Sequence, residues 1–65
     1  MRKTLATSAT IGGIKKMISN YFYGSTIELR NYPQMKYVWE IYNSNGLIVG
    51  FEVEYKRDRY RFISI

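Results

Sequence analysis

The apolar residues between Thr10 and Tyr23 recur at intervals of three and four positions. They are Ile11, Ile14, Met17, Ile18, Tyr21 and Phe22. This spacing places them on one face of a helix, because an α-helix completes a turn in about 3.6 residues. Lys15 and Lys16 fall on the opposite face. The pattern predicts one helix over residues 10–23, with Ser8 or Thr10 as its N-cap.

Beyond Gly24 the pattern changes from helical spacing to alternation of apolar and polar positions. Four stretches are rich in β-branched and aromatic residues, which is typical of strands. They cover residues 25–30, 35–42, 47–55 and 59–65. Short polar segments separate them, so neighbouring stretches are expected to form hairpins. The sequence therefore predicts an α+β fold, in which one N-terminal helix packs on one face of a four-stranded antiparallel meander spanning residues 25–65.

The loop lengths determine which side chains face the helix, because a shift of one residue turns a whole strand over. A three-residue loop at 44–46 pairs Trp39 with Phe51 and gathers the large apolar side chains on one face, so burial favours it. At the last hairpin, a loop of two or four residues pairs Tyr55 with Tyr60. The face expected under the helix carries Ile27, Leu29, Tyr37, Trp39, Ile41, Val49, Phe51, Val53, Tyr55, Tyr60 and Phe62.

The other face of the predicted sheet has no element in the pattern to cover it. It combines aliphatic and aromatic side chains with a charged border, an arrangement typical of protein interfaces. The predicted partner-binding residues are Val38, Glu40, Tyr42, Ile48, Glu52, Arg61, Ile63 and Ile65. Two other covers are compatible with the sequence: the N-terminal residues, or a second copy of the chain pairing along residues 61–65 to give a homodimer.

The length and composition indicate a single small domain over residues 1–65. Residues 1–9 are basic and rich in Ser and Thr, and we expect them to form a flexible leader. The chain has no cysteine and no histidine, so neither a disulfide nor a Cys/His zinc site is expected. No cofactor is expected either. The missing cysteines favour a cytoplasmic location, and no apolar run is long enough to span a membrane.

The net charge of +5 and the pI of about 9.7 indicate an acidic partner. The surplus positive charge lies on the leader, on the helix and around the last predicted hairpin. Direct binding of nucleic acid through the leader and these side chains is therefore an alternative function. Besides the leader, its predicted contacts are Lys15, Lys16, Lys56, Arg57 and Arg59.

Catalysis is not expected of this chain. Glu40 and Glu52 are neighbours on the open face, but a flat sheet offers no cleft that excludes water, and no histidine is present to act as a base. The main expectation is a small non-enzymatic interaction protein that binds a larger protein through the open sheet face, such as a protein that handles nucleic acid. Domains of this size without catalytic groups are typical of inhibitors and regulators, including those that mobile elements direct at host machinery.

Overall fold

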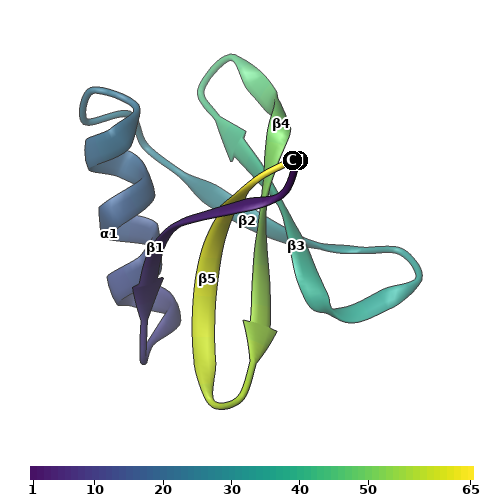
Figure 1. The fold of residues 1–65 in the computed structure, drawn as a ribbon. Coiled ribbons are helices and arrows are strands. Elements are labelled where there is room, and N and C mark those ends of the chain that lie inside the picture. The colour runs from purple at the N-terminus through teal and green to yellow at the C-terminus, as the bar shows by residue number, and fades with distance from the viewer.

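The structure, a computed structural model, describes all 65 residues as one helix and a five-stranded antiparallel sheet (Figure 1). The elements in chain order are β1 (Lys3–Ser8), α1 (Ile11–Tyr21), β2 (Glu28–Tyr32), β3 (Met35–Asn43), β4 (Gly46–Lys56) and β5 (Arg59–Ser64). The strands lie side by side in the order β1-β5-β4-β3-β2. The predicted α+β class and antiparallel sheet are confirmed, with five strands in place of the predicted four.

The additional strand lies in the segment that was predicted to be a flexible leader. β1 pairs antiparallel with β5, from Lys3 opposite Ser64 to Ser8 opposite Tyr60, and the two chain ends meet (Figure 1). The prediction of a loose leader over residues 1–9 is therefore wrong. Its polar composition concealed the strand, because the edge of β5 offers backbone N–H and C=O groups that need no apolar partner.

The helix begins directly after β1, at a cap that the sequence predicted. The backbone N–H of Gly13 donates to the Thr10 hydroxyl over 3.0 Å, so Thr10 is the N-cap. Gly13 also allows the end of β1 to lie close to the helix, since a Cβ at this position would collide with the Ser8 hydroxyl. The helix ends at Tyr21, and it lacks the length and apolar character needed to cross a membrane.

The main core lies between α1 and the sheet. Its buried side chains are Ile14, Ile18, Ile27, Ile41, Val53 and Phe62. The two helix residues come from the predicted apolar stripe, and the other four were expected on the helix-facing side of the sheet. Burying an aliphatic or aromatic side chain contributes roughly 1.5–3 kcal/mol. These six residues therefore supply a large share of the stability available to so short a chain.

The hairpin between β3 and β4 differs from the predicted register. Asn43 pairs with Gly46, so the loop is two residues long, and Ile41 pairs with Ile48 where Val49 was expected. Ile48 consequently packs against the core, and Val49 is 81% exposed. The three-residue loop and the placement of Ile48 on the open face are both wrong.

A bulge in β4 then restores the predicted facing of the next residues. Glu40 pairs with Glu52, so residues 49–51 of β4 have no partner on β3. Gly50 lies within the bulge at a φ of 91°, a conformation that favours glycine. Beyond the bulge Trp39 faces the helix side, as the sequence predicted, but it pairs with Val53 and not with the predicted Phe51. Local propensities do not reveal such a bulge, so the length of the loop was not enough to predict the pairing between β3 and β4.

Candidate anion-binding site

The face of the sheet away from the helix is partly closed by the N-terminal segment. Val38, Glu52 and Ile63, three of the predicted partner-binding residues, are each less than 10% exposed. Arg2 lies just before β1, and its guanidinium donates hydrogen bonds to Glu52 and, over 3.3 Å, to Glu54. The chain itself therefore supplies a cover for this face, which is one of the two alternatives that the sequence left open.

The other predicted partner-binding residues do not form one exposed patch. Glu40, Tyr42 and Arg61 are half-buried, Ile65 is exposed, and Ile48 lies on the helix side of the sheet. The Tyr42 hydroxyl donates to Glu40 over 3.3 Å. The guanidinium of Arg30 lies 4.3 Å from the centre of the Tyr42 ring. Tyr42 therefore has partners within the chain on its hydroxyl and on one face of its ring.

Arg2 also compensates an unfavourable pair of carboxylates. Glu40 and Glu52 lie directly opposite each other on β3 and β4, and like charges in this position destabilise a sheet. The hydrogen bond to Glu52 is the main reason why the pKa of Arg2 is raised. Burial, followed by the charges of Glu52 and Glu40, raises the pKa of the nearby Tyr32 phenol. Arg2 thus holds a buried negative charge in place.

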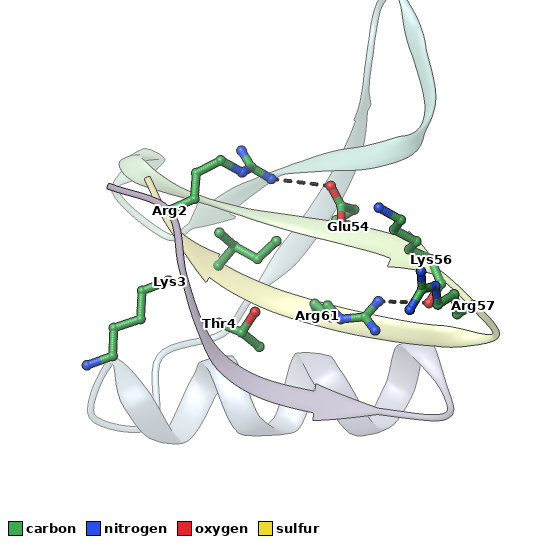
Figure 2. Close-up of a pocket in the computed structure, with 8 residues that line it drawn as sticks. Arg2, Lys3, Thr4, Glu54, Lys56, Arg57 and Arg61 are labelled. Atoms are coloured by element: carbon green, nitrogen blue, oxygen red, sulfur yellow. Dashed lines mark hydrogen bonds and ion pairs between the residues drawn. The ribbon is translucent and has the colours of Figure 1, made fainter.

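A basic hollow of about 400 Å³ lies between the start of β1 and the end of the β4–β5 hairpin (Figure 2). It is shallow and polar, and five of its eight lining residues are cations while one is a carboxylate. The residues that line it are Arg2, Lys3, Thr4, Glu54, Lys56, Arg57, Arg61 and Ile63. The single carboxylate, Glu54, already accepts a hydrogen bond from Arg2. The hollow therefore has the charge of an anion-binding site.

Two distant parts of the chain build the hollow. β1 contributes Thr4, which lies opposite Ile63 of β5, while Glu54 of β4 lies opposite Arg61. Figure 2 shows Lys56 and Arg57 at one end of the hollow and Arg2 at the other, with Lys3 pointing outward at the rim. Without β1 pairing on β5, the cations at the two ends of the chain would not meet.

A tight turn positions the cations at the hairpin end. The loop is two residues long, because Lys56 pairs with Arg59, and the predicted pairing of Tyr55 with Tyr60 is confirmed. Arg57 and Asp58 both have positive φ, at 55° and 61°, as the twist of a two-residue hairpin requires. Non-glycine residues adopt this conformation at a cost of roughly 1–2 kcal/mol each. Such strain often accompanies functional positions.

Asp58 at this turn is held by the neighbouring strand. The Tyr55 hydroxyl lies 3.4 Å from a carboxylate oxygen of Asp58 and donates to it. Burial, and then the charge of Asp58, raises the pKa of Tyr55. Asp58 forms no ion pair with the basic residues beside it. Its carboxylate therefore does not tie down the cations that line the hollow.

Most cations around the hollow have no acidic partner. Lys3, Lys56 and Arg57 are exposed and form no ion pair. Arg61 forms no ion pair either. Its guanidinium donates to the backbone carbonyl of Lys56 over 2.8 Å, and this neutral acceptor leaves the charge of Arg61 uncompensated. An anion that enters the hollow therefore does not compete with an internal carboxylate for these three exposed side chains.

The sequence-predicted nucleic-acid residues divide between two places. Lys56 and Arg57 line the hollow, and Arg59 is exposed at the same hairpin end. Lys15 and Lys16 lie on α1 and do not line it. The prediction also included the basic leader, and Arg2 and Lys3 of that segment line the hollow. Its position beside the last hairpin could not be predicted, because no local signal connects the first residues with the last strand. No known protein family, curated protein or solved structure matches this chain.

Proposed function

We propose that this chain is a small non-enzymatic protein that binds nucleic acid, holding the phosphate backbone in the basic hollow and at the adjoining hairpin end. The observation that supports the proposal is the convergence of five cations around one carboxylate that is already bonded to Arg2. Backbone phosphates provide most of the affinity in sequence-independent binding of nucleic acid. The net charge of +5 agrees with a polyanionic partner.

The expected affinity depends on salt in a way that can be calculated. Each phosphate that a lysine or arginine neutralises contributes about 0.7–0.9 to the slope of log affinity against log salt. Lys56 and Arg57, which have no acidic partner, are the side chains most available for such contacts. Removing both charges should therefore lower that slope by about 1.4–1.8.

The test compares two double variants that change the net charge equally. K56Q/R57Q alters the hollow, whereas K15Q/K16Q alters the helix. Binding of a fluorescently labelled oligonucleotide is followed by anisotropy over a series of salt concentrations. We expect K56Q/R57Q to weaken binding and flatten the salt dependence, and K15Q/K16Q to change both much less. Equal effects of the two variants would show that overall charge, not the hollow, is responsible, and would contradict the proposal.

A protein partner is a second candidate function, supported by a different surface. Leu47, Val49 and Ile65 are 49%, 81% and 52% exposed. The Ile65 N–H donates to the carbonyl of Gly50 over 2.8 Å, so Ile65 and Val49 lie at the same corner of the molecule. Exposed aliphatic side chains that gather in one place are typical of interfaces.

Affinity purification separates this candidate from the first. A protein partner that docks at the aliphatic corner should be retained by K56Q/R57Q and lost by Val49→Asp. A partner that is lost both after nuclease treatment and in K56Q/R57Q would instead be attached to the chain through nucleic acid. Light scattering at two protein concentrations checks whether the partner is a second copy of the chain.

A further inference from the structure

Four aromatic side chains form a row across the three central strands, on the sheet face that carries the helix. We call Tyr37, Trp39, Tyr55 and Tyr60 the aromatic row. The ring centres of Tyr55 and Tyr60 are 4.6 Å apart, those of Trp39 and Tyr60 are 5.6 Å apart, and those of Tyr37 and Tyr55 are 6.1 Å apart. The row therefore continues without a gap from β3 through β4 to β5.

The helix leaves this row partly uncovered. α1 packs against β1 and β5, and the aromatic rings at its C-terminal end, Tyr21 and Phe22, lie against Phe51 and Phe62. Trp39 and Tyr60 pack against the edge of the core but stay half-buried. Tyr37 has no such cover and is 60% exposed. Packing of the core explains the inner end of the row but not the exposed outer end.

The row and the basic hollow reach the same end of the molecule from opposite faces of the sheet. Tyr55 and Tyr60 belong to the row, and the four residues between them form the charged turn of the β4–β5 hairpin. Their side chains point to the helix side, whereas Arg61 and Glu54 point to the side of the hollow. A chain that crosses this hairpin end therefore meets cations first and aromatic rings next, or the reverse.

We infer that the preferred ligand is a single-stranded nucleic acid, whose phosphates contact the cations of the hollow and hairpin turn while its unpaired bases stack on the aromatic row. This inference rests on the proposed function and specifies its substrate class. Single-strand binding proteins combine a basic track with aromatic rings in this way, because every base has a face that can stack. A duplex would use the cations alone, since its bases are already stacked on one another.

The test measures the affinity of the whole chain for oligothymidylate and for a duplex of equal length. Tyr37→Ala removes the most exposed ring, and Tyr37→Phe keeps the ring while removing its hydroxyl. Tyr23→Ala is the matched control, because Tyr23 is fully exposed and lies outside the row. Stacking contributes about 1–3 kcal/mol per base, so Tyr37→Ala should weaken binding of the single strand by about 5- to 150-fold. Tyr37→Phe and Tyr23→Ala should bind it like the unmodified protein.

Trp39 supplies an independent readout, because it is the only tryptophan in the chain and belongs to the row. Oligothymidylate should quench its fluorescence, and the duplex should not. Equal loss of affinity for single strand and duplex in Tyr37→Ala, or unchanged affinity for both, would overturn the single-strand inference while leaving the proposed function in place. If neither oligonucleotide binds in a salt-dependent manner, the proposed function fails and the inference fails with it.

Discussion

Replacing Arg2 by glutamine tests whether the N-terminal segment holds the far face of the sheet together. The Glu52 side chain is only 8% exposed, and its ion-pair partner Arg2 is 50% exposed. In Arg2→Gln the carboxylate would stay beneath the surface, directly opposite Glu40, without a cation. The substitution therefore leaves a buried charge uncompensated and also exposes the repulsion between two carboxylates.

The expected loss of stability lies between two known limits. Removing one partner of a fully buried ion pair costs about 3–5 kcal/mol, whereas a solvent-exposed pair contributes about 0.2–1 kcal/mol. Because Arg2 is half exposed, water screens the pair and can replace part of it, so we expect a loss of about 1–2 kcal/mol. A domain of this size has only about 3–5 kcal/mol in total, so the variant should fold with a lowered Tm. Each kcal/mol corresponds to about 4–8 °C.

The assay is urea denaturation of Arg2→Gln, Glu52→Gln and the double variant, analysed as a double-mutant cycle. We expect the loss in the double variant to be smaller than the sum of the two single losses, because the second change removes the unpaired charge. Arg30→Gln is the matched control, since the Arg30–Glu28 pair is exposed on both sides, at 57% and 63%. This control should shift the urea midpoint less than Arg2→Gln does, because an exposed pair contributes only about 0.2–1 kcal/mol.

Two results would refute the reasoning. Strict additivity in the cycle would show that Arg2 and Glu52 do not interact in solution. A shift in Arg2→Gln no larger than that in Arg30→Gln would show that Arg2 is a solvated surface side chain and that β1 does not cover the sheet. High salt provides a further check, because screening should diminish the contribution of an exposed pair more than that of one whose carboxylate is buried.

Two further predictions concern the bulge and the alkaline limit of stability. Gly50→Ala should destabilise the fold by about 1–2 kcal/mol, because φ at Gly50 is 91°, even though the added Cβ would meet no atom. Gly12→Ala in the helix should stabilise the fold by up to about 1 kcal/mol, since alanine favours a helix and its Cβ has open space there. Shifts in Tm of the same sign in both variants would contradict this prediction. The raised pKa of Tyr32 means that the fold favours the neutral phenol over the ionised one. The resulting contribution to the free energy of unfolding is complete below about pH 10, the ordinary pKa of tyrosine, and is lost as the pH rises through the higher pKa of the folded state. Ultraviolet titration should show two late-ionising phenols, Tyr32 and Tyr55, and Tyr32→Phe should remove one of them. Tyr32→Phe should also lose less stability than the unmodified protein over that range.

The parts of the candidate site near the last hairpin could be predicted from the sequence. The pairing of Tyr55 with Tyr60 and the cluster of cations between them follow from alternation and a short polar loop, and the structure has both. The aromatic row was partly hidden, because the residues were expected under the helix and the helix covers only one end of them. How far an 11-residue helix reaches across a sheet depends on packing. Alternation reports which face a side chain occupies and says nothing about whether that face is covered.

The sequence by itself determined the helix, the last four strands and the identity of most core residues, because spacings of 3.6 and 2 positions are local properties of the chain. The tertiary structure alone decided the strand at residues 3–8, the bulge at Gly50 and the closing of the far sheet face. Arg2 meets Glu52 across 50 positions of sequence, and this contact exists only because the two ends of the chain pair as neighbouring β1 and β5. The basic hollow depends on the same pairing. Backbone hydrogen bonds can join any two strands whose edges are free, so a polar segment carries no local mark of the partner that it will find.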